Sequence, residues 1–186
     1  MVISKLHEMT QSLNKFGLVG LVLLMAGGAA YFSFRKDQPK LYINEFMANN
    51  SSCCPDSLNK VDEFEDWIEI YNAGNVAVDI GGLYFSQNKE KPLGYQITKK
   101  NPDVTTIEPG GFLLLWADGD QSRGTLHFGF RLDQDGEFIG LYDIDGRIID
   151  SITFEEQKEN ISFGRSTDGG ESWKEFSAPT PGAANQ

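Results

Sequence analysis

The alternation of apolar and polar residues between positions 66 and 74 predicts a central β-strand. Aromatic and β-branched residues are interspersed with acids there, in the order DWIEIYNAG. Because successive side chains of a strand point to opposite faces, Trp67, Glu69 and Tyr71 should share one face, while Ile68 and Ile70 share the other. The Asn-Ala-Gly ending is typical of a turn. We therefore expect an interior strand that ends near residue 72.

Short strands separated by Gly-, Asp- and Pro-containing turns fill the rest of the chain after residue 41. Their pattern predicts an all-β fold, an immunoglobulin-like antiparallel β-sandwich, with a hairpin over 137–154 and no helix. The continuous apolar run at 112–117 suits a strand covered on both faces in the middle of the core. The other expected strands are 41–47, 76–80, 83–86, 95–98, 104–107, 126–130, 161–165 and 173–176.

An uncharged apolar segment, residues 16–34, precedes this domain and is closed by Arg35 and Lys36. Its nineteen residues suffice for one helical crossing of a hydrocarbon core of about 30 Å. The sequence therefore predicts a polar segment over 1–15, a single transmembrane helix over 16–34, a linker over 35–40 and one domain over 41–186.

A cleaved signal peptide is the alternative interpretation of the same segment. Gly28, Ala29 and Ala30 offer the small residues that a cleavage site needs, but the apolar run continues beyond them to Phe34. Basic residues are nearly balanced on the two sides of the segment, so the orientation of an anchor is not fixed by them. Either interpretation normally exports the domain, and we expect it at a membrane on the extracytoplasmic side.

The charge of the chain is unevenly distributed. Residues 1–40 carry a balance of +3, whereas residues 41–186 carry −14, which gives the net charge of −11. Such an acidic domain repels the phosphates of nucleic acids, and Lys99-Lys100 is its only basic doublet. Nucleic-acid binding is therefore not expected.

Several ordered motifs carry a family resemblance: 43–49 (INEFMAN), 66–72 (DWIEIYN), 109–119 (PGGFLLLWADG), 141–146 (LYDIDG) with 150–151 (DS), and 162–165 (SFGR) with 179–185 (PTPGAAN). Together they resemble the lamin tail domain family over nearly all of residues 41–186. The resemblance implies an immunoglobulin-like β-sandwich that acts as an interaction module, with no catalytic residue to carry over. No heptad run is present, so the filament-forming rod of animal lamins is not implied. The chain is more similar to prokaryotic members that are exported or tethered to a membrane.

Carboxylates are the most abundant functional groups, and calcium is the ion that they would suit. Weak calcium candidates are Asp62, Glu63, Glu65 and Asp66, in the long loop that leads into the central strand. Asp-x-Asp pairs occur at 118/120, 133/135 and 143/145, but none continues into a full calcium-loop pattern. Because Asp hydrogen-bonds its own backbone in tight turns, turn formation is the favoured interpretation of these pairs.

The adjacent Cys53 and Cys54 form either a disulfide or a pair of free thiols. Outside the cell, a vicinal ring or intermolecular disulfides fit the sequence, and inside the cell two free thiols do. His127 lies in an apolar segment without a nucleophile motif and is interpreted as a strand histidine. Trp67 and Trp116 are expected in the core, and Trp173 is the tryptophan to examine for exposure.

The sequence as a whole predicts a non-catalytic binding or scaffolding module, held at a membrane by its N-terminal helix, with a protein or an envelope polymer as partner. No catalytic or cofactor-binding residue is expected. Two alternatives are kept, an exported calcium-dependent adhesion module and a hydrolase that acts on an envelope polymer. The loop between residues 48 and 65 is the first candidate for a site, since long loops on rigid scaffolds often carry function.

Overall fold

The chain divides into two compact units, Met1–Gln38 and Pro39–Gln186. In the computed structural model, the residues described are 19–22, 32–35, 39–54 and 64–186.

The first unit contains two short paired strands where the sequence predicts a transmembrane helix. β1 (Val19–Val22) pairs antiparallel with β2 (Phe32–Arg35). Valine and phenylalanine favour strands, and the four glycines of the segment weaken a helix. The helix prediction is therefore wrong for these two stretches, while residues 16–18 and 23–31 lie outside the described part. Among the described residues, no helix has the length and apolar character needed to cross a membrane.

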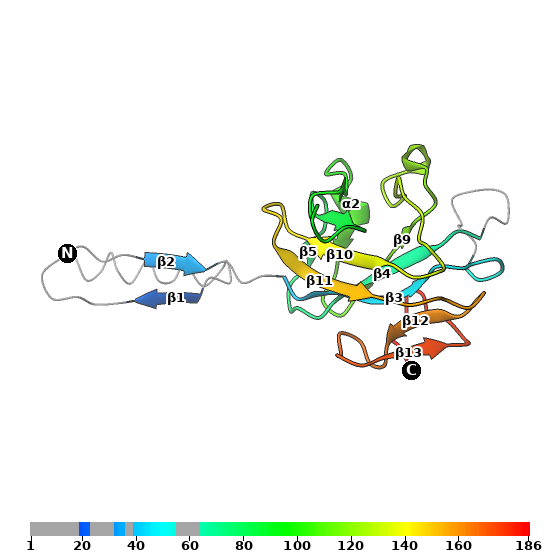
Figure 1. Cartoon of the computed structure of the whole chain (residues 1–186). Coiled ribbons are helices and arrows are strands. Elements are labelled where there is room, and N and C mark those ends of the chain that lie inside the picture. The colour runs from blue at the N-terminus through cyan, green and yellow to red at the C-terminus, as the bar shows by residue number, and fades with distance from the viewer. Residues whose placement is uncertain (1–18, 23–31, 36–38, 55–63) are drawn as a thin grey trace, which may run out of the picture. The chain divides into compact units, whose positions relative to one another are not determined.

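One sheet of the second unit has five antiparallel strands, in the order β13-β12-β3-β4-β9 (Figure 1). Their bounds are β3 Leu41–Met47, β4 Trp67–Asn72, β9 Phe112–Trp116, β12 Ser162–Arg165 and β13 Trp173–Phe176. The expected alternation in β4 is confirmed. Ile68 and Ile70 belong to the main hydrophobic core, whereas Trp67 packs with Met47 and Trp116 in a separate buried cluster.

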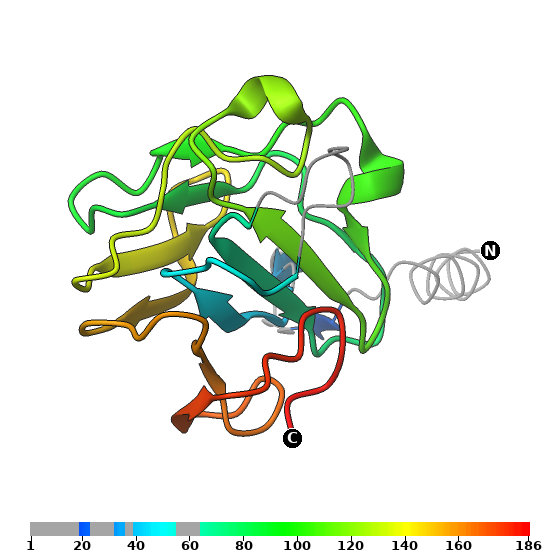
Figure 2. The same ribbon diagram turned by 90° about the vertical axis from the view of Figure 1, so that its right-hand side faces the viewer.

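The other sheet has four antiparallel strands, in the order β11-β10-β6-β7. It consists of β6 Tyr84–Ser86, β7 Tyr95–Gln96, β10 Phe138–Tyr142 and β11 Ile148–Thr153, and the pair β5 (Val78–Asp79) and β8 (Thr106–Ile107) lies outside it. One core joins the two sheets, since Ile43 and Ile70 share it with Phe85 and Leu141. The predicted all-β antiparallel sandwich is confirmed (Figure 2), and its form is consistent with an immunoglobulin-like fold.

Three details of the predicted domain are wrong. Residues 102–105 form a short helix, α2 (Pro102–Thr105), because Pro102 suits the first turn of a helix. A 3₁₀ turn, η1 (Gln121–Arg123), is a second unexpected helical element. Residues 126–130 form no strand. The apolar strand β9 is covered on both faces, as expected, with Leu115 in the main core and Trp116 in the cluster of Met47 and Trp67, and it lies at the edge of its sheet.

Candidate functional site

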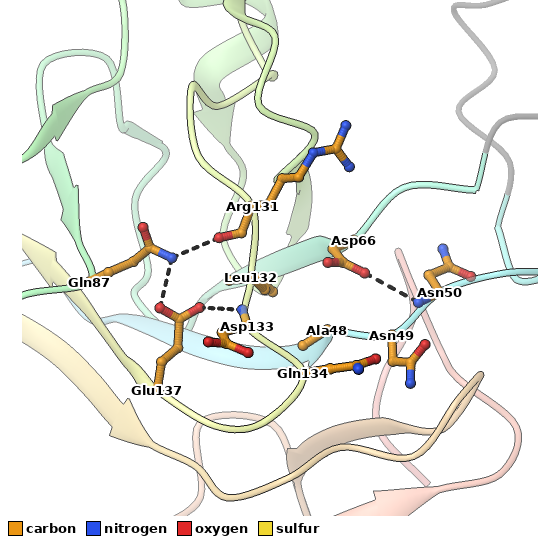
Figure 3. Close-up of a pocket in the computed structure, with 10 residues that line it drawn as sticks. All are labelled: Ala48, Asn49, Asn50, Asp66, Gln87, Arg131, Leu132, Asp133, Gln134 and Glu137. Carbon is orange, nitrogen blue, oxygen red and sulfur yellow. Dashed lines mark hydrogen bonds between the residues drawn. The ribbon is translucent and has the colours of Figure 1, made fainter.

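A hollow of about 640 Å³ lies at the end of the sandwich where β3 and β6 end and where β4 and β10 begin (Figure 3). The side chains around it are mostly carboxamides and carboxylates, which present hydrogen-bonding groups rather than an apolar surface. The lining residues are Ala48, Asn49, Asn50, Asp66, Gln87, Arg131, Leu132, Asp133, Gln134 and Glu137. We refer to it as the loop-end hollow.

Asp66 and Glu137 are the two carboxyl groups of the hollow whose acidity is altered. Burial raises the pKa of Asp66 to about 6, although a hydrogen bond from the backbone N–H of Asn50 (3.2 Å) and the charge of Arg131 act in the opposite direction. Burial likewise raises the pKa of Glu137. The oxygens of Glu137 accept hydrogen bonds from the backbone N–H of Asp133 (2.9 Å) and from Nε2 of Gln87 (2.7 Å).

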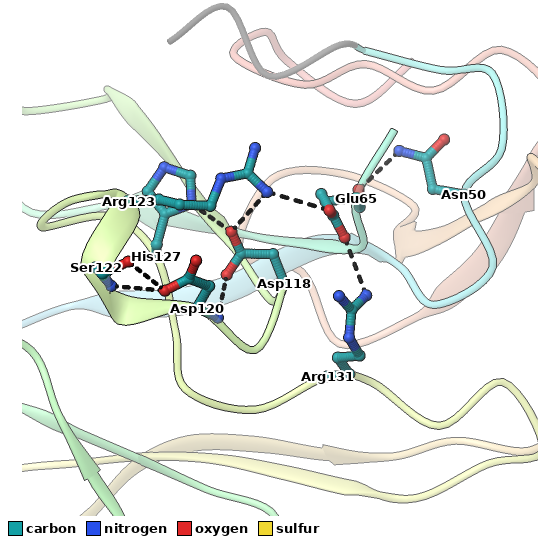
Figure 4. Close-up of polar contacts among 8 residues, drawn as sticks. All are labelled: Asn50, Glu65, Asp118, Asp120, Ser122, Arg123, His127 and Arg131. Atoms are coloured by element: carbon teal, nitrogen blue, oxygen red, sulfur yellow. Dashed lines mark hydrogen bonds and ion pairs between the residues drawn. The ribbon is translucent and has the colours of Figure 1, made fainter. Parts of the chain in front are cut away.

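A charged network lies beside the hollow (Figure 4). Glu65 accepts one ion pair on each oxygen, from Arg123 at 3.1 Å and from Arg131 at 3.0 Å. Arg123 also contacts Asp118 at 3.1 Å, and Nδ1 of His127 lies 2.7 Å from the same Asp118 oxygen. Because Arg131 lines the hollow while its guanidinium binds Glu65, the network fixes one wall of the hollow.

The pairing of His127 with Asp118 does not form a catalytic triad. The side chains of both residues are fully buried, so the imidazole cannot reach a bound substrate. Ser122, the serine of the neighbouring 3₁₀ turn, donates its hydroxyl hydrogen bond to Asp120. His127 therefore acts as a buried structural residue.

The calcium candidates are only partly brought together. Asp62 and Glu63 lie outside the described residues, Glu65 is paired with two arginines, and Asp66 lines the hollow. Within the part of the chain that the structure describes, no group of three or more His, Cys, Asp or Glu side chains is arranged to hold a metal ion.

The three Asp-x-Asp pairs form turns, as the favoured interpretation expected. In each pair the first carboxylate accepts a hydrogen bond from the backbone N–H two residues later, at 2.9 to 3.0 Å, in Asp118, Asp133 and Asp143. Each turn also contains a glycine with positive φ: Gly119 lies between Asp118 and Asp120, and Gly136 and Gly146 directly follow the other two pairs. These aspartates thus fix loop conformation, and the loop of Asp133 is one that borders the hollow.

Cys53 and Cys54 are joined by a vicinal disulfide. Asn50 links this ring to the hollow. Its side chain accepts from the N–H of Cys53, donates to the carbonyls of Cys53 and Glu65, and its backbone N–H binds Asp66. The disulfide ring therefore lies in the loop that positions Asn50, one of the residues lining the hollow.

The tryptophans do not form an exposed aromatic platform. Trp67 and Trp116 are buried, which confirms their expected place in the core. Trp173 is half-buried, with its ring stacked on Phe163 and the guanidinium of Arg165 lying over it.

A second polar cluster lies on the outer face of the five-stranded sheet, where the C-terminal segment 177–186 crosses β3 and β4 (Figure 2). Glu45 accepts hydrogen bonds from the N–H and the hydroxyl of Thr180, and Glu69 accepts one from the N–H of Gly182. Asn44 and Asn185 bond each other and complete the cluster. Three motifs noticed separately in the sequence thus form one hydrogen-bonded unit, which we call the C-terminal clamp.

Most residues that line the hollow are not predicted by the sequence analysis. Of the four acids proposed from the sequence, only Asp66 is among the lining residues. Gln87, Gln134 and Glu137 belong to polar loops without periodicity, and only the folded chain brings them near residue 66. The one available signal was the length of the loop after β3, which does supply Asn49 and Asn50.

The comparisons with known proteins agree with this architecture. The sequence model of the Lamin Tail Domain matches residues 35–156, a range that includes β3 to β11 and every residue lining the hollow. No curated protein and no solved structure matches the chain. Strands β12 and β13 and the C-terminal segment lie beyond the matched range. Since the match covers more than half of its length, the chain belongs to the lamin tail domain family.

Proposed function

We propose that this protein is a non-catalytic binding module that holds its ligand in the loop-end hollow and is tethered to a membrane through residues 16–34. The observation that carries the proposal is the hollow itself, a polar depression built from four loops of a rigid sandwich. Loops on a rigid scaffold are where binding sites concentrate. Membership in a family of interaction domains supports the same function.

The proposed partner is a protein or an envelope polymer, and nucleic acid is disfavoured. Asp66, Asp133 and Glu137 would repel a phosphate backbone at this site. No cofactor is part of the proposal. A ligand that binds only the folded state raises the melting temperature. Since calcium is not the proposed ligand, adding calcium should leave the melting temperature unchanged. A rise in melting temperature with calcium would favour the adhesion-module alternative.

A photo-crosslinking experiment tests binding at the hollow. Benzoylphenylalanine is placed in the full chain at Gln134, an exposed residue of the hollow, and at the exposed Glu171 as a control. Irradiation of cells should give a discrete adduct from position 134 and none from position 171. The absence of an adduct specific to position 134 would contradict a ligand site at the hollow.

The proposed location is the extracytoplasmic side of a membrane. The uncharged run of residues 16–34 supports a tether, and the disulfide between Cys53 and Cys54 fits an oxidising compartment.

Cysteine labelling tests the location. The chain carries Cys53→Ser, Cys54→Ser and Gln186→Cys, and a membrane-impermeant maleimide is applied to intact and lysed cells. Labelling of intact cells is expected. Labelling only after lysis would place the domain in the cytoplasm and contradict this part of the proposal.

Hydrolysis of an envelope polymer is a second candidate, favoured by one observation. Asp66 and Glu137 are two carboxyl groups in one hollow, and burial raises the pKa of both. Glycosidases use a pair of carboxyl groups, of which the general acid has a raised pKa. If the protein is such an enzyme, it should release reducing ends from an envelope polysaccharide, and Asp66→Asn should abolish that release.

A further inference from the structure

We infer that the loop-end hollow recognises a neutral, hydroxyl-rich ligand, namely a saccharide. This inference rests on the proposed function and assigns a chemical class to the ligand of that site. It depends on the hydrogen-bonding groups that the hollow leaves unused, on its charge and on its size.

Two side-chain amides at the hollow are available for a ligand. Within the described part of the chain, the amides of Asn49 and Gln134 have no hydrogen-bond partner, whereas their backbones are anchored. The carbonyl of Asn49 accepts from the N–H of Asn160 at 2.8 Å, and the carbonyl of Gln134 accepts from the N–H of Gln157 at 2.7 Å. The hollow therefore holds two amides on anchored backbone, each able to donate and to accept.

Two carboxylates add acceptors, each oriented by one hydrogen bond from a backbone N–H. Asp66 uses one oxygen, Oδ1, to accept from the N–H of Asn50, and Asp133 uses one oxygen, Oδ1, to accept from the N–H of Asp135. Figure 3 shows that Asp133 and Gln134 come from one loop, whereas Asp66 and Asn49 come from two other segments, with the Gln134 side chain drawn beside that of Asn49. In both carboxylates the second oxygen is the one available to a ligand.

This combination fits hydroxyl groups better than it fits ions. A hydroxyl donates one hydrogen bond and accepts others, so neighbouring hydroxyls can satisfy a carboxylate and an amide together. A cation would leave the N–H groups of Asn49 and Gln134 unused. A phosphate or a carboxylate would meet three carboxyl groups, Asp66, Asp133 and Glu137, against the single lining cation Arg131, whose guanidinium already binds Glu65.

The size of the hollow also suits a saccharide rather than a single charged group. Its volume of about 640 Å³ is within the range of small-molecule sites, roughly 300 to 1,000 Å³. The lining contains no aromatic ring, so recognition would rely on hydrogen bonds without stacking. We therefore expect weak binding by a single hollow and detectable binding where many copies of a glycan are displayed together.

The experiment applies the full chain in detergent to a printed array of neutral, acidic and amine-bearing oligosaccharides. The best-bound glycan is then measured by saturation-transfer NMR, and fluorescent hexalysine serves as a cationic probe. We expect binding to neutral glycans. Asp66→Asn and Gln134→Ala should each weaken it about tenfold, as the loss of a hydrogen bond to a fixed partner predicts. Glu171→Gln is the matched control, since it removes one negative charge at an exposed site away from the hollow.

Three outcomes would overturn the inference. One is that the wild-type protein binds no glycan, and another is that glycan binding is unchanged by both hollow substitutions. The third is that hexalysine alone binds and is lost in Asp66→Asn. That last result would leave the proposed binding site intact while showing that the ligand class is cationic. By contrast, the absence of a specific crosslink at position 134 would contradict the proposal that any ligand binds at the hollow.

Discussion

At the scale of single residues, Glu69 is a carboxyl group held in the outer face of a sheet. Its side chain is fully buried, and burial raises its pKa from 4.5 to about 7, even though the N–H of Gly182 and the amide of Asn44 donate hydrogen bonds to it. The folded state therefore binds this proton more tightly than the unfolded chain does. The free energy of unfolding should fall as the pH rises from about 4.5 to about 7, and should then level off.

Replacing Glu69 with Gln removes this titration and should flatten the pH profile. Asp66 and Glu137 titrate with the same sign in both proteins, so the difference between wild type and Glu69→Gln isolates residue 69. Gln has a single acceptor oxygen, and we expect an additional loss of about 1 kcal/mol at low pH. Urea unfolding at several pH values between 4.5 and 8 measures both effects. Parallel profiles for the two proteins would contradict the assignment.

At the scale of elements, one ion pair joins the two sheets. Asp150 of β11 accepts from Arg165 of β12 at 2.7 Å and from the N–H of Ile43 in β3 at 2.8 Å. Arg165 is buried and also donates to the carbonyl of Ile43. Removing one partner of such a pair leaves an uncompensated buried charge.

Asp150→Ala should therefore lower the free energy of unfolding by about 3 to 5 kcal/mol, measured by urea denaturation. Asp145→Ala is the control, because Asp145 pairs with Arg147 where both side chains are more than 60% exposed. Exposed pairs contribute about 0 to 1 kcal/mol. Equal losses in the two variants would show that Asp150 does not join the sheets as described.

The C-terminal clamp gives a second prediction at this scale. Ending the chain after Phe176 removes the donors that Thr180 and Gly182 supply to Glu45 and Glu69, together with both interactions of Asn185 with Asn44. Since a hydrogen bond contributes about 1 kcal/mol net and several are lost together, the loss should exceed 3 kcal/mol. Thermal melting measures it. A chain ending at Asn185 loses only the exposed contact between Lys174 and Gln186, and should melt like the wild type.

How much of the structure could be predicted differs between strands and site. Strict alternation identified β3 and β4 closely, because each buries a different set of side chains on its two faces. The continuous apolar run of β9 correctly predicted a strand covered on both faces, because Leu115 lies in the main core while Leu114 and Trp116 pack with Met47 and Trp67. The residues lining the hollow could not be predicted from the sequence. They come from separate loops, and these loops lie side by side only because the two sheets pack together.

At the scale of the whole molecule, the division into two units predicts that the sandwich is independent of what precedes it. A chain of residues 39–186 should melt at the temperature of the full protein, because the core lies entirely within this unit. The shortened chain should also leave the membrane fraction, if residues 16–34 are the tether. A lower melting temperature would contradict the independence of the unit, and retention in the membrane fraction would contradict the tether.

The C-terminal clamp also orders the folding of the chain in time. Asn185 bonds the carbonyl of Asn44 across 141 positions of sequence, so β3, the first strand of the sandwich to be synthesised, is completed by some of the last residues. Contacts this distant close slowly and late. Until they close, Glu45 and Glu69, which face each other across β3 and β4, lack the hydrogen-bond donors of Thr180 and Gly182. The outer face of this sheet is thus completed only when the C-terminal residues arrive.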